Sequence, residues 1–422
     1  MARRSHTTIA TSGLRRAYKF RLRPTKGQHQ RLNQCLEAHR ELYNAALEER
    51  RAAYDCVVRK SAGYFGPERP KLSVGFASQS AQLVHIRANR PDIAIFGSSS
   101  EQATLRRLDR AFQGFFRRVK AGETPGYPRF KPAHRFNSVV WPSPGNYGGC
   151  RWHSETKRVY LKGIGHVKAT AHREVQGRIK TIEVKREGSK WYLVLSCDGV
   201  PSKPLPATGR DIGLDMGLAN FLSTSSGEHI ENPRYAKMVA KDLAGAKHRL
   251  SLKTKESNNS RGVRGRVAKI HRKVKNQRLD FHHKTARKLV SDYDLICVEN
   301  LDIRAMIKKP KYVPNPESPG NFLPGECSVK TRRRNKAIQD AGWAQFRSIL
   351  EAKAEEAGRR VLSVDPRHTS ETCSNCGHVD AGNRIKQAVF KCQQCGHGAH
   401  ADMNAARNIL RAGLALLVAQ AA

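Results

Sequence analysis

Residues 372–410 read TCSNCGHVDAGNRIKQAVFKCQQCGHGAHADMNAARNIL, and this stretch holds two closely spaced pairs of cysteines. A gap of two residues within each pair lets one tight turn point both thiolates at the same ion, and the glycine that follows permits a positive φ. Four thiolates close a tetrahedral zinc site, so the metal would hold the fold rather than perform chemistry. We therefore predict a structural zinc ribbon with the ligands Cys373, Cys376, Cys392 and Cys395.

Two other interpretations of this cluster stay open, namely a redox-active dithiol pair and a chance spacing. His378, His397 and His400 lie close by and could substitute as zinc ligands, although four cysteines already fill the site. The other cysteines are scattered, and we expect them to be buried small apolar residues. They are Cys35, Cys56, Cys150, Cys197, Cys297 and Cys327.

Three acidic residues draw attention because acids are scarce in this chain and these lie in or beside apolar segments. Asp215 lies in the strand-like run IGLDMG, Glu299 lies at the end of LICVEN, and Asp402 stands at the start of a helical pattern. Acids in two strands and at a helix start can converge at the edge of one sheet. Two Mg²⁺ ions need such carboxylates when they activate water and stabilise the leaving oxygen of a phosphodiester.

Simpler roles for these acids stay open. Asp402 could be a helix N-cap, Glu299 a surface acid at a strand end, and Asp215 a turn residue. Other nearby acids rank lower because they lie in turns or at the opposite end of a strand from the proposed site. These alternatives are Asp211, Asp294, Asp302, Asp365 and Asp380.

The chain has 422 residues, with 77 Lys plus Arg against 36 Asp plus Glu, which gives a formal net charge of +41. This excess points to a polyanionic partner. The charge is spread along the chain rather than concentrated on one amphipathic helix, so nucleic acid is favoured over a membrane surface. No apolar run reaches the roughly 18 residues that span a bilayer, and no secretory signal is present, so we expect a cytoplasmic protein without a membrane partner.

The hydrophobic pattern changes along the chain. A strand over Ala17–Thr25 precedes a helical region of about residues 30–120, and short strands follow until a proline-rich linker at 200–209. Beyond the linker, strands alternate with helices, which indicates an α/β domain. We expect a helical break near Ser257–Gly265 and a loop rich in proline and arginine up to about Lys336.

Several motifs together resemble one family. YKFRLRPTKGQ near the start, LYNAALEER, IGLDMG, VENL and the cysteine-rich block are similar to segments of the TnpB family of transposon-encoded RNA-guided nucleases. They also resemble the compact type V CRISPR effectors derived from it. The resemblance covers about residues 15–412, and the block quoted first is its most specific part.

The resemblance implies an α/β multidomain fold. A RuvC-like (RNase H-type) nuclease domain with an inserted Cys₄ zinc ribbon follows a wedge β-barrel, which a helical recognition domain interrupts. The expected segments are the barrel at 1–28 and 122–205, the recognition domain at 29–121, the nuclease domain at 206–371 and 400–422, and the ribbon, which binds target nucleic acid, at 372–399.

The resemblance also implies residue roles. The catalytic acids of the family fall on Asp215, Glu299 and Asp402, and its zinc knuckles fall on the four cysteines. Arg384 matches a recurrent arginine that would contact phosphate in the active site, although a ribbon-surface arginine is the alternative. His400 and Ala401 stand where many transposon members have Asp-Arg, and this form favours a compact CRISPR effector.

The implied activity is RNA-guided cleavage of double-stranded DNA. A guide RNA would supply sequence specificity, a short flanking motif would mark the target, and one Mg²⁺-dependent site would cut both strands. The basic helices and the barrel would bind the guide RNA, and the helical break near Ser257–Gly265 and the loop around Arg332–Arg334 would lie along the nucleic-acid channel. A monomer is favoured over a dimer. The alternatives are a non-cleaving RNA-guided DNA-binding or transposition accessory protein, and a guide-independent resolvase or transposase.

Overall fold

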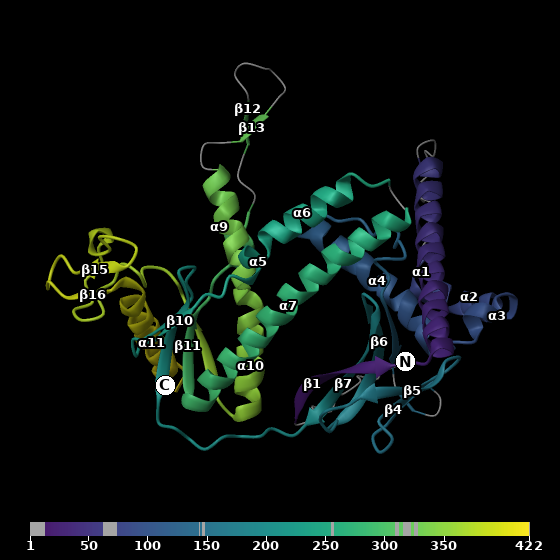
Figure 1. Cartoon of the computed structure of the whole chain (residues 1–422), viewed down its shortest axis with the longest axis horizontal. Helices are drawn as coiled ribbons and strands as arrows, with labels where there is room; N and C mark the ends of the chain where they lie inside the picture. Colours follow the sequence, from purple (N-terminus) through teal and green to yellow (C-terminus); the bar gives the residue numbers. More distant parts are fainter. Residues whose placement is uncertain are drawn as a thin grey trace. The chain divides into compact units, whose positions relative to one another are not determined.

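The computed structural model describes residues 13–61, 74–142, 144–145, 148–254, 257–308, 312–314, 322–324 and 328–421 (Figure 1). The chain divides into two compact units, Met1–Pro201 and Ser202–Ala422, so the division falls in the proline-rich segment expected to be a linker. The finer division into barrel, recognition, nuclease and ribbon segments stays a prediction. In the parts that the structure describes, no helix has both the length and the apolar character that crossing a bilayer requires.

The first unit contains a seven-stranded antiparallel sheet. Its strands, in spatial order, are β2 (Ser138–Pro142), β6 (Arg178–Glu187), β7 (Lys190–Val200), β1 (Leu14–Arg23), β5 (Gly165–Thr170), β4 (Arg158–Leu161) and β3 (Cys150–His153). In β1, Tyr18, Phe20 and Leu22 are buried and Lys19 between them is exposed, which confirms the predicted alternation. A β-bridge pairs Gly145, which follows the edge strand β2, with Cys150, the first residue of the opposite edge strand β3. The sheet is therefore nearly closed into a barrel.

Between β1 and β2, the described residues form four helices. They are α1 (Lys26–Ser61), α2 (Phe76–Asn89), α3 (Pro91–Ala94) and α4 (Ser98–Lys120). The apolar stripes of α1 and α4 pack together, and Leu42, Leu47, Leu105 and Leu108 are all buried there. The predicted helical region is therefore confirmed, while residues 62–73 of its Ser-, Pro- and Gly-rich part lie outside the described residues.

The second unit contains a five-stranded mixed sheet. Its strands, in spatial order, are β10 (His229–Glu231), β9 (Asn220–Thr224), β8 (Asp211–Asp215), β11 (Leu295–Glu299) and β14 (Arg360–Val364). The last three are parallel to one another, and β9 and β10 form an antiparallel edge. The alternation of strands and helices confirms the α/β expectation.

Helices and two small hairpins complete this unit. The helices are α5 (Tyr235–Met238), α6 (Ala240–Ser251), α7 (Asn258–Asp292), α8 (Ile303–Met306), α9 (Ser328–Ala341), α10 (Trp343–Ala357), the 3₁₀ turn Ala381–Asn383 and α11 (Ala401–Ala421). The hairpins are β12 (Tyr312–Pro314) with β13 (Phe322–Pro324), and β15 (Val389–Lys391) with β16 (Gly398–His400).

The sheet of the second unit is covered on both faces. Along β11, Ile296 and Val298 join the core that includes α7 and α10, whereas Leu295 and Cys297 join a separate core with Ile409 of α11. All five residues of β11 are buried, as expected of a parallel strand covered on both faces. Helix α11 therefore covers one face of the sheet, and helices α7 and α10 cover the other face.

Two glycines let α11 lie unusually close to the sheet. A Cβ atom on Gly213 of β8 would lie 2.1 Å from the carbonyl oxygen of Ala406 and 2.8 Å from the amide nitrogen of Leu410. A Cβ atom on Gly413 of α11 would lie 2.1 Å from the sulfur of Cys297. Contacts this short are excluded, so glycine at both positions fixes the depth at which α11 packs on the sheet.

Gly213→Ala should therefore destabilise the second unit by about 3 kcal/mol, because its methyl group would push against helix backbone that cannot give way locally. Gly245→Ala in α6 is the matched control, since a Cβ atom there would meet nothing within 4 Å. The control should be neutral or stabilising by up to about 1 kcal/mol. Urea unfolding measures both variants, and equal losses of stability would contradict the close packing of α11.

The expected helical break over Ser257–Gly265 was wrong in position. Helix α7 begins at Asn258, and the hydroxyl of Ser257 caps it by accepting a hydrogen bond from the amide of Ser260 at 3.1 Å. Gly262 and Gly265, which suggested the break, lie inside the helix. Each costs about 1 kcal/mol of helix propensity, which a helix of 35 residues can tolerate.

The predicted end of the proline- and arginine-rich loop, at about Lys336, was also wrong. Arg332–Arg334 lie in helix α9, which begins at Ser328. The prolines that suggested a loop all precede residue 325. Ile338 and Ala341 on one side of α9 are buried in the core of the second unit, and this packing stabilises a strongly basic helix.

Candidate active site and zinc centre

Asp215 and Glu299 come together because their strands are neighbours. Strands β8 and β11 are parallel, and their register pairs Leu214 with Val298, so the next residue in each strand is one of the two acids. Side chains alternate along a strand, and the residues two positions earlier in both strands contact α11. Both carboxylates therefore face the side of the sheet that α11 covers.

Asp402 reaches the same place from the helix. It is the second residue of α11, one turn before the residue that contacts Gly213. The negative charges of Glu299 and Asp402 both act on Asp215, which shows that the three carboxylates share one site. The convergence expected from the sequence is thus observed, whereas the catalytic role of these residues stays a prediction.

Two polar side chains contact the acids. Arg384, from the segment between the cysteine pairs, lies with its Nη2 atom 3.3 Å from Oδ1 of Asp402 and donates a hydrogen bond to the carbonyl oxygen of Gln387 at 2.8 Å. Thr369 donates a hydrogen bond from its hydroxyl to Oε1 of Glu299 at 2.7 Å. The sequence pointed to Arg384 but not to Thr369, whose only signal is its place in the HTSETC run before the ribbon.

The site concentrates negative charge that the protein only partly neutralises. Burial raises the pKa of Asp215 to about 7, and the charges of Glu299 and Asp402 add to this effect while Arg384 opposes it. Burial also raises the pKa of Glu299, against the hydrogen bond from Thr369. Carboxylate oxygens in such surroundings fit divalent cations such as Mg²⁺, which bind oxygen ligands and relieve the repulsion.

The metal-free protein should therefore lose stability as pH rises. The pKa of Asp215 is higher in the folded state, at about 7, than the ordinary value of 3.8, so folding favours the protonated form and stability falls from pH 4 to pH 8. Asp215→Asn removes this penalty of a few kcal/mol, at about 1.4 kcal/mol per pKa unit.

Thermal melting in chelator measures this effect. Asp215→Asn should melt several degrees above the unsubstituted protein at pH 8, and the difference should vanish near pH 4. Asp242→Asn, at an exposed position of α6, is the control and should change little at either pH. If Asp215→Asn melted at a lower temperature than the unsubstituted protein at pH 8, the claim that burial and neighbouring charges penalise the ionised Asp215 would be wrong.

The other candidate acids have structural roles. Asp294 pairs with Arg359 and accepts hydrogen bonds from the amides of Thr208 and Gly209. The remaining acids cap short turns, pair with a neighbouring arginine, or lie at the far end of β8. They are Asp302 and Asp380 as caps, Asp365 beside Arg367, and Asp211 at the start of the strand.

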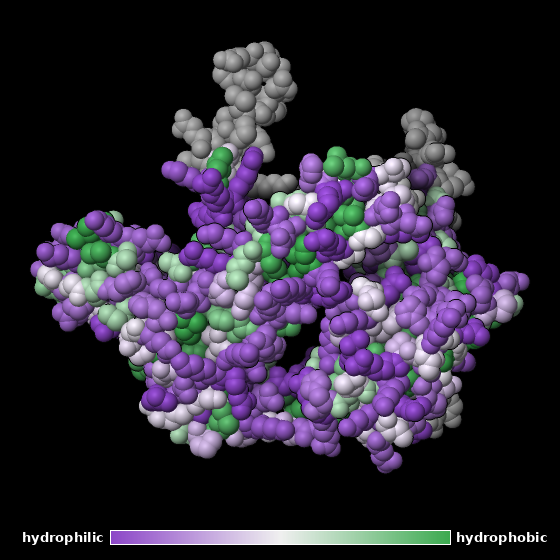
Figure 2. All heavy atoms as spheres, viewed as in Figure 1, coloured by the Kyte–Doolittle hydropathy of each residue, from purple (hydrophilic) through white to green (hydrophobic). Residues whose placement is uncertain are grey.

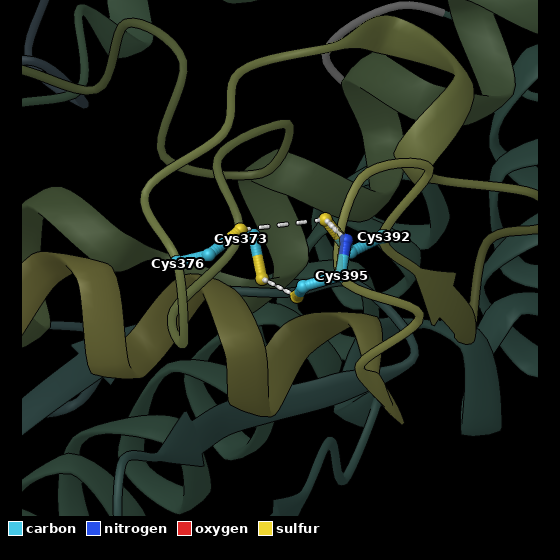
Figure 3. Close-up of side chains that lie close together, drawn as sticks. All are labelled: Cys373, Cys376, Cys392 and Cys395. Carbon is cyan, nitrogen blue, oxygen red and sulfur yellow. Dashed lines mark hydrogen bonds between the residues drawn. The ribbon is translucent and has the colours of Figure 1, made fainter.

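The four cysteines of the ribbon gather into one cluster (Figure 3). The sulfur atoms of Cys373 and Cys395 lie 3.7 Å apart, those of Cys376 and Cys392 lie 3.6 Å apart, and all four lie within 4.8 Å of one another. Tetrahedral zinc with Zn–S bonds of about 2.3 Å requires sulfur–sulfur distances of about 3.8 Å. The cluster therefore fits a structural zinc ion.

The two knuckles repeat one backbone pattern. The amide of Cys373 donates to the carbonyl of His378 at 2.8 Å, and the amide of Cys392 donates to the carbonyl of His397 at 2.9 Å. Gly377 has φ of 82° and Gly396 has φ of 71°, the positive values expected after each pair. Among the described residues, the cysteines form the one group whose ligand atoms lie close enough for a single metal ion, and no histidine belongs to it.

Four scattered cysteines are buried as expected, namely Cys35, Cys150, Cys197 and Cys297. The side chains of Cys56 and Cys327 lie outside the described residues.

Three known families match separate parts of the chain. Residues 343–409 match "Cas12f1-like, TNB domain", which includes all four cysteines and Asp402, and residues 182–309 match "Probable transposase", which includes Asp215 and Glu299. Residues 13–57 match a family described as "Helix-turn-helix domain". The structure has strand β1 followed by α1 in that segment rather than two helices joined by a turn.

A relative of similar length comes from Escherichia coli and is named "Putative RNA-guided DNA endonuclease InsQ". It is 29% identical over 403 residues, which cover 95% of this chain and 93% of that protein. The chain is TnpB-like. The "CRISPR-associated endodeoxyribonuclease Cas12f1" of Sulfoacidibacillus thermotolerans is 29% identical over 248 residues, which cover 55% of this TnpB-like chain and 52% of that protein.

A solved structure shares the fold. The protein in "Cryo-EM structure of the Cas12f1-sgRNA-target DNA complex" matches with a TM-score of 0.56 at 15% identity, over 94% of this chain and 98% of that one. The expected α/β multidomain fold, with a nearly closed barrel and a cluster of four cysteines, is thereby confirmed.

Proposed function

We propose that this TnpB-like protein is an RNA-guided DNA endonuclease that cuts at Asp215, Glu299 and Asp402. The convergence of three carboxylates at one end of the sheet, with Glu299 buried and Asp215 and Asp402 partly buried, carries the proposal. The full-length relative whose name describes an RNA-guided DNA endonuclease supports it, as does the protein solved with guide RNA and target DNA.

The acids would hold divalent cations, which we propose are two Mg²⁺ ions. Burial and the charges of Glu299 and Asp402 raise the pKa of Asp215, and a pair of divalent cations held by the three carboxylates would relieve the repulsion among them. When bound, such ions polarise the phosphodiester and activate water for hydrolysis.

The neighbouring side chains orient the acids. The hydroxyl of Thr369 holds Glu299 in one rotamer, and Arg384 holds Asp402. Arg384 is partly exposed and lies beside carboxylates that attract cations, so its guanidinium can also donate to a phosphate that enters the site. We propose that it contacts the substrate phosphate while Gln387 supports it from behind.

The net charge of +41 supports a large nucleic-acid partner. Hydrophilic side chains cover most of the face drawn in Figure 2. We propose that a guide RNA and a double-stranded target DNA are the partners, with base pairing supplying specificity. A monomer that binds one guide is the simplest assembly, and the bound RNA would distinguish a CRISPR effector from a transposon-encoded nuclease.

The test is to express the protein with its flanking genomic DNA, purify it and sequence the bound RNA. A discrete RNA and cutting of a plasmid that matches its guide, in the presence of Mg²⁺, is the expected result. Bound RNA with target binding but no cutting would indicate a non-cleaving RNA-guided protein. Cutting without any defined RNA would indicate a guide-independent resolvase or transposase.

A further inference from the structure

A pocket of about 580 Å³ lies in the second unit. One wall is formed by Leu218 and Ala219, which follow Asp215 after the end of β8. Another wall is formed by Gln387, whose carbonyl oxygen accepts a hydrogen bond from Arg384 of the acid site. Two separate segments of the chain therefore connect the pocket to the acid site, although none of the three acids lines it.

The walls of this pocket are held together by hydrogen bonds. The side chain of Asn232 donates to the carbonyl oxygen of Leu218 at 3.2 Å, and Arg234 donates to the same oxygen at 3.3 Å. Asp340 of α9 accepts from the backbone amide of Ala236 at 3.0 Å. These bonds tie residues 232–236 to the loop after β8 and to α9, so the pocket exists without a ligand.

The lining combines an apolar interior with cations. The apolar lining residues are Leu218, Ala219, Ala236, Ala240 and Ala337. Lys237, Arg333 and Lys336 also line the pocket, and in the described part of the chain none of them pairs with a carboxylate. The carboxylate of Asp340 already accepts from two backbone amides. An apolar surface beside free cations suits a base or sugar next to a phosphate.

We propose that this cationic pocket holds a nucleotide of the single-stranded DNA that is being cut, next to the phosphodiester at the acid cluster. The apolar interior would receive the base or sugar, and Arg333 and Lys336 would bind the adjoining phosphate. The volume suits one nucleotide, because pockets for ligands of that size measure about 300–1,000 Å³. The inference rests on the proposed nuclease function and names the substrate contacts of the same site.

The experiment compares variants of the guide-loaded protein on a matched target with Mg²⁺. Arg333→Ala combined with Lys336→Ala should slow cutting about tenfold or more, because the strand is held less firmly near the acids. Target binding should stay within about twofold, and the cutting rate should depend less steeply on salt. Arg334→Ala is the matched control, because Arg334 is exposed on the same helix but does not line the pocket.

A second variant tests the pocket without a change of charge. Ala337→Phe places a ring inside it and should slow cutting by a similar factor while guide and target binding persist. Equal cutting rates for the double variant, the filled pocket and Arg334→Ala would overturn the inference alone. Loss of guide RNA from the double variant but not from Arg334→Ala would overturn it as well, since the pocket would then hold guide RNA. Failure of the unsubstituted complex to cut would refute the proposed function together with the inference.

Discussion

Asp215→Asn should reduce cutting of a guide-matched target by about a thousandfold or more, because the proposed two-metal chemistry uses all three carboxylates. The amide has the same size, so the strand and the packing of α11 should be preserved. Guide RNA and target binding should remain within about twofold of the unsubstituted protein. Cleavage rates and binding by gel shift on the same preparations measure the two effects separately.

The control for this loss lies on the same strand. Asp211→Asn changes an exposed acid at the other end of β8 and should leave cutting unchanged. Glu299→Gln and Asp402→Asn should match the loss at Asp215. Retained cutting in any of these three variants would remove that acid from the catalytic set, and a loss of target binding would show that the acids support the fold instead.

Cys373→Ser should release the zinc and unfold the ribbon. Its sulfur is fully buried and lies 3.7 Å from that of Cys395, so the substitution opens the tetrahedral site at its most enclosed corner. Structural zinc contributes about 10 kcal/mol or more to folding of such small modules, and the ribbon also supplies Arg384 to the acid site. Zinc content should therefore fall to near zero, and cutting should fall with it.

Metal analysis and thermal melting on purified protein measure this prediction. Cys35→Ser is the control, since Cys35 is a buried cysteine of the first unit outside the cluster. That variant should keep its zinc even if packing suffers. Full zinc content in Cys373→Ser would mean that the metal lies elsewhere or that the cluster holds none.

The gathering of the four cysteines and of the three acids could be predicted, because the local pattern places each of these residues in its own turn, strand or helix. Each cysteine pair needs only one turn and one glycine, which residues 373–377 and 392–396 contain. The acids Asp215 and Glu299 each occupy the last position of an apolar strand, and parallel strands that are adjacent bring their carboxyl ends to one edge. Those features follow from a few neighbouring residues.

Other features depend on packing between distant segments and could not be predicted in this way. The hydrogen bond from Thr369 to Glu299 spans 70 residues. The need for glycine at 213 is visible only once α11 lies on β8. Helix α7 runs through Gly262 and Gly265, because the cap at Ser257 and the packing of Ala286, Leu289 and Val290 in the core stabilise the whole helix.

The central claim is that base pairing with a bound RNA directs the carboxylate site to its target. The most direct measurement replaces the guide segment of the bound RNA with an unrelated sequence and presents two plasmids, one matching each guide. The account predicts that cutting moves entirely to the plasmid that matches the new guide, and that Asp215→Asn abolishes it. Cutting that stays on the original plasmid, or that strikes both equally, would contradict RNA-guided cleavage by this site.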